Sequence, residues 1–134
     1  MKSIIIFFSL LVGLTAYADL PPQEDLLDKK YWSTLDEKAK PAFLMGFRYG
    51  GGCQTIDIFM NTDQFQERLK HLNTHTVPGV VSAIDAFYKA EDNAHVYLRS
   101  AIEAGLMQII GNPKMEIEKF TNKAREVQEK RAWK

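Results

Sequence analysis

The sequence predicts an all-α protein, and three observations support this fold class. After residue 34, apolar residues recur at spacings of three and four, the period of one face of an α-helix. Cap and breaker signals divide this pattern into segments of helical length. The clearest is Gly111-Asn112-Pro113, which supplies a C-terminal glycine, a cap and a first-turn proline in order. No segment alternates convincingly with period two, as a half-buried strand would. We therefore expect a compact bundle of four or five helices with short loops.

The first 18 residues have the form of a secretory signal peptide. Lys2 supplies the charged region, residues 4–14 are apolar apart from Ser9 and Gly13, and Ala16-Tyr17-Ala18 is a small-x-small cleavage site. The apolar stretch is too short for a bilayer span, which needs about 20 residues. We expect cleavage after Ala18 and a periplasmic or secreted protein; an N-terminal anchor that stays attached is the alternative.

Cleavage after Ala18 would leave 116 residues, the size of one domain. We expect residues 19–33 to form a surface segment and residues 34–134 to form a single helical domain. The whole chain has a formal net charge of zero, and loss of Lys2 with the signal peptide leaves −1. This balance argues against binding nucleic acid or anionic lipid through bulk electrostatics.

The boundaries of the helices follow from the capping signals. Thr34 and Glu37 fit a capping box, so we expect the first helix to begin at Thr34. The apolar spacing continues through three glycines, which favours one helix over about 34–60 rather than a helix broken at Gly50 to Gly52. Further helices are expected over about 62–72, 78–89, 94–110 and 113–130.

Glycines are unusually frequent in the first helical segment. Ala42, Gly46 and Gly50 fall at successive i+4 positions, although each glycine costs a helix interior about 1 kcal/mol relative to alanine. A smooth strip of this kind lets another helix or a ligand approach the backbone closely. We therefore expect these three residues to form a close-packing face. The run Gly50 to Gly52 lacks the following Lys-Ser/Thr of a phosphate loop, so we expect no cofactor there.

Cys53 is the only cysteine. An exported protein with a single cysteine has no internal disulfide and must rely on packing. Three roles stay open for Cys53: a buried inert residue, an intermolecular disulfide that makes a homodimer, or a reactive thiol.

Histidines are poorly placed for a metal site. His71 and His75 are four residues apart, the spacing of two ligands on one helix face. The residues around them favour turns over helix, and no carboxylate stands in the HExxH position. A third ligand would have to come from His95, far along the sequence. We therefore expect no metal.

Three carboxylates lie on predicted helices: Asp57, Asp85 and Glu103. Two of them in one cleft could hydrolyse glycosides, but solvation or pairing with Arg48 or Arg99 explains them as well. Arg48 lies among residues that look like core, so it must reach water, pair with an acid or serve a pocket. Asp85 and Asp57 are the expected acids, and a ligand or partner is the alternative.

Two blocks of the sequence resemble a known family. The stretch from Phe43 to Gly50 resembles the Phe-x-x-Gly-Tyr-x-x-Gly core of the small periplasmic immunity proteins that neutralise type VI secreted peptidoglycan amidases. Residues 77–110 are similar in layout to that family's second half. In both, a helix ending in an aromatic residue, here Phe87-Tyr88, is followed by a polar break near a histidine, here Asn93 and His95, and then by a helix with small-apolar pairs, here Ala101-Ile102.

The resemblance implies an all-α fold and inhibition of an effector in the periplasm by binding. Family members usually carry paired cysteines, whereas this chain has only Cys53. In this feature the chain departs from the family.

Our first hypothesis is an exported helical binding protein of the immunity type, not an enzyme, that occludes a secreted cell-wall effector. The expected contact residues are Arg48, Tyr49, Tyr88, Asn93, His95 and Tyr97. Tyrosine and arginine dominate interface hot spots. The alternatives are a small cell-wall hydrolase using Cys53 or carboxylates, and a structural envelope protein with no ligand.

Overall fold

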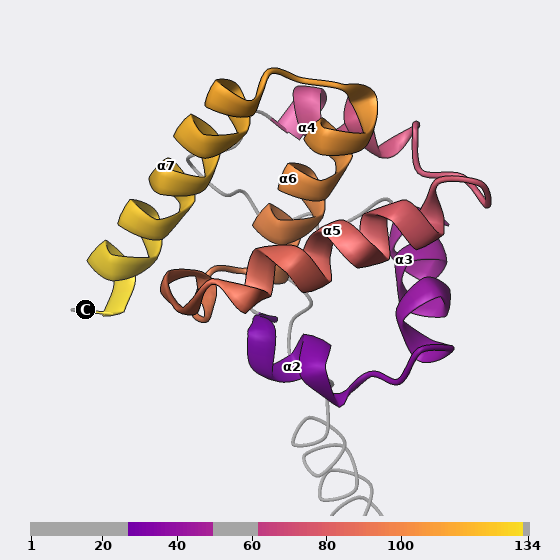
Figure 1. Cartoon of the computed structure of the whole chain (residues 1–134), viewed down its shortest axis with the longest axis horizontal. Helices are drawn as coiled ribbons and strands as arrows, with labels where there is room; N and C mark the ends of the chain where they lie inside the picture. The colour runs from indigo at the N-terminus through magenta and orange to yellow at the C-terminus, as the bar shows by residue number, and fades with distance from the viewer. Residues whose placement is uncertain (1–26, 50–61, 133–134) are drawn as a thin grey trace, which may run out of the picture.

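Six α-helices and one short 3₁₀ helix make up the part of the chain that the structure describes. The structure is a computed structural model that describes residues 27–49 and 62–132. In chain order the elements are α2 (Lys29–Thr34), α3 (Ala39–Tyr49), α4 (Thr62–Leu69), α5 (Val77–Lys89), the 3₁₀ helix η2 (Glu91–Asn93), α6 (Leu98–Ile110) and α7 (Lys114–Ala132). These ranges contain no strand (Figure 1), so the predicted all-α class is confirmed for them. The signal peptide and the glycines from Gly50 to Gly52 lie outside the described residues.

The centre of the fold is the contact between α5 and α6, the most extensive between any two described helices. Residues 98–107 of α6 are all buried, including the polar residues Arg99, Ser100 and Glu103. The two helices approach closely at Gly105, where an added Cβ would lie 3.4 Å from the Cβ of Ala83 and 3.6 Å from a methyl carbon of Val80. Gly79 of α5 is a second such position, because an added Cβ would lie 2.9 Å from Cδ1 of Ile109 on α6.

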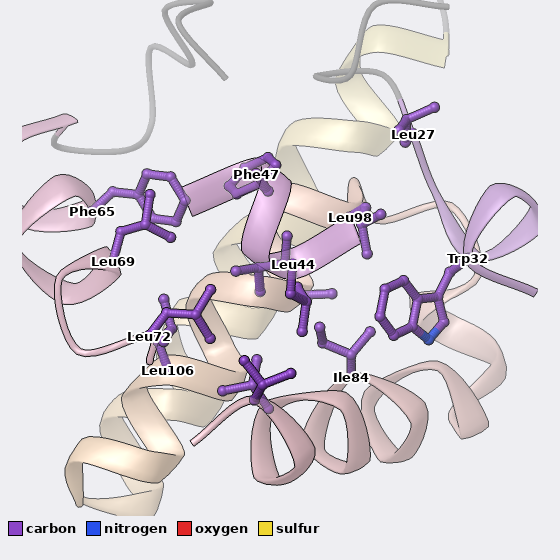
Figure 2. Packing of buried hydrophobic residues seen from close by; sticks show 14 of the residues in the cluster. Leu27, Trp32, Leu44, Phe47, Phe65, Leu69, Leu72, Ile84, Leu98 and Leu106 are labelled. Carbon is purple, nitrogen blue, oxygen red and sulfur yellow. The ribbon is translucent and has the colours of Figure 1, made fainter. Parts of the chain in front are cut away.

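The hydrophobic core lies between this pair and the helices that precede it. Figure 2 shows ten of its labelled side chains: Leu27, Trp32, Leu44, Phe47, Phe65, Leu69, Leu72, Ile84, Leu98 and Leu106. Each side chain of this size contributes about 1.5–3 kcal/mol when it is fully buried. The core therefore draws on α3 and α4 as well as on α5 and α6.

The start of the helical domain differs from the prediction. Thr34 is the last residue of α2, and its hydroxyl donates to the carbonyl of Tyr31 in the same helix. The side chain of Asp36 instead accepts hydrogen bonds from the backbone N–H groups of Lys38 at 2.9 Å and Ala39 at 2.7 Å. Asp36 is therefore the cap of α3, and the predicted capping box at Thr34 is wrong. An aspartate side chain satisfies the free N–H groups of a helix start as well as a threonine does.

The additional short helix α2 raises the count above the four or five helices expected. Its N-cap is Asp28, whose side chain accepts from the backbone N–H of Lys30 at 2.8 Å. Trp32 inserts into the core and is only 2% exposed. The segment before residue 34 is thus part of the folded body at Leu27 and Trp32.

The last helix lies to one side of the others, as the yellow end of the chain in Figure 1 shows, and its main neighbour is α6. The preceding turn contains Gly111, whose φ of +88° lies in the left-handed region that glycine adopts without strain. Between residues 114 and 130 of α7, only Thr121 and Ala124 are buried. Among the described residues, no helix is both long enough and apolar enough to cross a membrane.

Candidate functional site

The glycine strip does not form the expected close-packing face. Ala42 and Gly46 are both exposed on α3, and a Cβ built on Gly46 would meet nothing within 4 Å beyond its chain neighbours and the nearby backbone of its own helix. Gly50 lies outside the described residues. The expectation is therefore wrong for Ala42 and Gly46: the core side of α3 is the one that carries Leu44 and Phe47.

Two of the six predicted contact residues are buried and use their polar groups internally. Tyr88 is 3% exposed, and its hydroxyl donates to the carbonyl of Val96 at 2.9 Å. Burial raises the pKa of the Tyr88 phenol well above its ordinary value, and the negative charge of Asp28 raises it further. Asn93 is 4% exposed. Buried side chains present almost no surface to a partner, so we do not include Tyr88 and Asn93 among the proposed contact residues.

The other two residues of the 88–97 region line an open cleft. This α7 cleft has a volume of about 820 Å³ and is lined by Asp28, Glu91, Asp92, His95, Val96, Tyr97, Arg125, Gln128 and Glu129. One wall is formed by Asp28 and the chain from Glu91 to Tyr97, and the other by α7. His95 is exposed and Tyr97 half-buried. The structure thus places these two predicted residues in one concave surface.

The two walls are joined by the side chain of Asn93. Its amide nitrogen donates to the carbonyl of Phe87 at 2.7 Å, which anchors η2 to the end of α5. Its amide oxygen accepts from Nε of Arg125 on α7, also at 2.7 Å. Arg125 makes a second hydrogen bond to Asn122 within its own helix. Asn93 therefore connects α7 to the end of α5 through hydrogen bonds.

The α7 cleft carries an excess of negative charge. Four of its side chains are carboxylates and one is a guanidinium. Asp28 caps α2, and Glu91 lies 3.5 Å from the ammonium of Lys29. Asp92 and Glu129 are exposed. Such a surface attracts cationic groups and repels anionic ones.

Arg48 and Tyr49 lie at a different place, at the end of α3. With Gln66, Leu69 and Lys70 of the α4 region they line a smaller depression of about 290 Å³, which we call the Arg48–Tyr49 hollow. Tyr49 is 76% exposed. The four predicted contact residues that are not buried therefore lie on two separate surfaces: His95 and Tyr97 in the α7 cleft, and Arg48 and Tyr49 in the hollow.

The expected ion pair between Arg48 and Asp85 is not formed. One carboxylate oxygen of Asp85 accepts from the indole Nε1 of Trp32 and lies against the ammonium of Lys40, each at 2.7 Å. The ammonium of Lys40 also lies 5.2 Å from the centre of the Trp32 ring. Asp57, the other expected partner, lies outside the described residues.

A buried ionic cluster lies between α4 and α6. Glu103 is 1% exposed and Arg99 is 3% exposed. Glu103 accepts a hydrogen bond from Arg68 of α4, and the guanidinium of Arg99 lies 4.6 Å from the centre of the Phe65 ring. Burial raises the pKa of the Glu103 carboxyl, while the charges of Arg68 and Arg99 oppose the shift. The cluster binds α4 to the central helix, as expected for charges that are buried only when paired.

The remaining candidates for chemistry form no site among the described residues. His71 and His75 are exposed in the turns between α4 and α5, and no group of three metal-ligating side chains occurs in residues 27–49 and 62–132. Asp85 and Glu103 are each held in separate internal pairs. Cys53 lies outside the described ranges.

Sequence reasoning missed most of the residues that line the α7 cleft. Arg125, Gln128 and Glu129 recur at helical spacing on the last predicted helix, but charged residues at this spacing usually form a solvated face. Their shared cleft depends on the angle at which α7 meets the 91–97 segment. Comparisons with protein-family models, curated proteins and solved structures found no match to this chain.

Proposed function

We propose that the protein is an exported helical binding protein of the immunity type, which occludes a secreted effector rather than acting by chemistry. The α7 cleft is the observation that carries the proposal. It combines an exposed histidine, a tyrosine and an excess of carboxylates in one concave surface. Proteins that act by occlusion need a surface of this kind and no reactive group at its centre.

The composition of the cleft favours a protein partner over a small ligand. Five of its nine lining residues carry a carboxylate or a guanidinium, whereas small-molecule sites have only a few polar groups. Interfaces between proteins have polar, charged rims that set specificity and the rate of association. The excess of carboxylates indicates a partner that presents lysine or arginine to the cleft.

The two described carboxylates that the sequence suggested for a hydrolase, Asp85 and Glu103, are held in separate ion pairs. Hydrolysis by paired carboxylates needs two of them flanking one bond, whereas Asp85 and Glu103 are each engaged in an internal pair. The thiol version depends on Cys53, which the structure does not describe.

The first experiment is affinity purification of the protein from its own periplasm, followed by identification of the retained proteins by mass spectrometry. We expect a secreted cell-wall enzyme in the eluate. The purified protein should inhibit the activity of that enzyme on peptidoglycan. An eluate without a partner, or a partner whose activity is unchanged by saturating protein, would refute the proposal.

The second experiment assigns the surface. Asp92→Lys with Glu129→Lys reverses two charges in the cleft, and Glu37→Lys with Glu118→Lys makes the same change at exposed residues outside it. Because interface charges act mainly on association, the cleft variant should lower the association rate by roughly tenfold and weaken its salt dependence. The control variant should associate like the wild type. Equal rates for the two variants would remove the α7 cleft from the interface.

A further inference from the structure

We infer that the Arg48–Tyr49 hollow is a docking point for a carboxylate side chain of a protein partner. This inference rests on the proposed function, and it assigns the partner a second feature: an acidic residue in addition to the basic group that suits the α7 cleft.

The structure describes the side chains of four arginines. Of these four, Arg48 alone makes no hydrogen bond or ion pair to an acid or amide. Arg68 contacts Glu103, Arg99 belongs to the buried cluster, and Arg125 bonds to Asn93 and Asn122. Arg48 is half-buried, and its guanidinium carbon lies 5.3 Å from the centre of the Tyr49 ring. Stacking occupies the flat face of a guanidinium and leaves its N–H edge available for a bidentate carboxylate.

The rest of the hollow complements this geometry. Leu69, only 3% exposed, forms an apolar floor, and Lys70 adds a second cation at the rim. The ammonium of Lys70 is held 2.6 Å from Glu67, so Arg48 is the cation with capacity for a new partner. The hollow thus presents a positive edge beside an aromatic ring.

The size of the hollow and the exposure of Tyr49 indicate a side chain as the occupant. A volume of about 290 Å³ lies at the lower limit for small-molecule sites, which run from about 300 to 1,000 Å³. Tyr49 is 76% exposed, so its ring is accessible to a partner. Adjacent arginine and tyrosine are also the residue types most enriched at interface hot spots.

The direct test uses peptides and needs no identified partner. Acetylated tetraglutamate amide is titrated into ¹⁵N-labelled protein at physiological salt, with tetraglutamine amide as the neutral control. We expect saturable shifts of the Arg48 Nε–H signal and of the Tyr49 and Lys70 amides with the glutamate peptide alone. The shifts of the two amides should disappear in Arg48→Gln and persist in Lys123→Gln, which removes the same charge from α7. Equal shifts with both peptides, or shifts that survive Arg48→Gln, would overturn the inference.

The second test uses the partner obtained from the periplasm. Arg48→Gln should weaken its binding at least about tenfold, the loss expected for a hot spot. Arg48→Lys should recover only part of the affinity, because an ammonium cannot make the bidentate contact, and Lys123→Gln should bind like the wild type. If Arg48→Gln binds as tightly as the wild type while the cleft variant does not, the docking point is refuted and the proposed function stands. If the periplasm yields no partner but the glutamate peptide binds at Arg48, the proposed function fails and the carboxylate specificity of the hollow stands.

Discussion

The Nε of Arg125 donates a hydrogen bond of 2.7 Å to the amide oxygen of Asn93, and this bond connects α7 to the corner between α5 and α6. Asn93 is buried, and its amide nitrogen donates to the carbonyl of Phe87. A single side chain thus satisfies a backbone group on one wall of the α7 cleft and a charged group on the other. The bond adds a polar connection to the apolar contacts that Phe120 and Ala124 make on α7.

Asn93→Ala should therefore destabilise the protein and loosen α7. The change leaves the Phe87 carbonyl and the Arg125 guanidinium without these contacts, and an unsatisfied buried polar group costs about 1–3 kcal/mol. Urea unfolding gives the loss of stability, and hydrogen exchange should show faster exchange in α7. Asn122→Ala is the control, because Asn122 is exposed and bonds the same arginine; it should cost less than about 0.5 kcal/mol. Equal losses for the two variants would contradict the role assigned to Asn93.

The bond from Trp32 to Asp85 should be important for the attachment of α2. Trp32→Phe keeps most of the buried ring but removes the indole N–H that donates to Asp85 at 2.7 Å. Asp85→Ala leaves this N–H without its acceptor and should cost about 1–3 kcal/mol. In the double variant the unpaired N–H is absent, so the loss should be smaller than the sum of the single losses. A thermodynamic cycle measured by urea unfolding checks this, and strictly additive losses would rule out the coupling.

The buried carboxyl of Glu103 should make stability depend on pH. Its pKa in the folded protein is raised above the ordinary value of 4.5, mainly because of burial. The folded state therefore holds this proton to higher pH than the unfolded chain does. The resulting stabilisation is present below 4.5 and is lost as the pH rises through the folded pKa, by roughly 1.4 kcal/mol per pH unit at most.

Glu103→Gln removes the titration and so isolates this contribution. We expect the stability of the wild type relative to Glu103→Gln to fall as the pH rises from about 4 to about 7. Urea unfolding of both proteins across this range is the measurement. Parallel stability curves would show that Glu103 has the same pKa in the folded and unfolded states.

Gly46 and Gly111 should respond in opposite directions to the same substitution. A Cβ at Gly46 would meet nothing within 4 Å beyond its chain neighbours and the nearby backbone of its own helix, so Gly46→Ala should stabilise the exposed side of α3 by about 0.5–1 kcal/mol. Gly111 has a φ of +88°, and Gly111→Ala should destabilise by about 1 kcal/mol or more because the left-handed region is strained for alanine. Melting temperatures of the two variants test this. A destabilised Gly46→Ala would restore the close-packing role that the sequence suggested.

Much of the local structure was readable from the sequence. The boundary at Gly111-Asn112-Pro113 is where α6 ends and α7 begins, and the helix expected over 78–89 is α5 at Val77–Lys89. Apolar spacing, proline and left-handed glycine act through a few neighbouring residues, and for this reason they can be recognised without a fold. The first helix shows the limit of such signals: Thr34-Leu35-Asp36-Glu37 contains two good capping residues, and the burial of Trp32 in α2 leaves Asp36 as the cap of α3.

The sequence by itself thus determined the all-α class of the described residues and the bounds of α5, whereas it missed α2 and placed the start of α6 at 94 instead of Leu98. Only the tertiary structure decided which side chains are available to a partner. Tyr88 and Asn93 were expected to contact a partner but are buried. Arg125 and Glu129 look like an ordinary solvated face but line the α7 cleft. Gly46 was expected to be a close contact, yet Gly79 and Gly105 are described glycines at which α5 and α6 meet. The physical reason is that exposure and contact depend on the angles at which helices pack, and these angles arise from interactions between residues far apart in the chain.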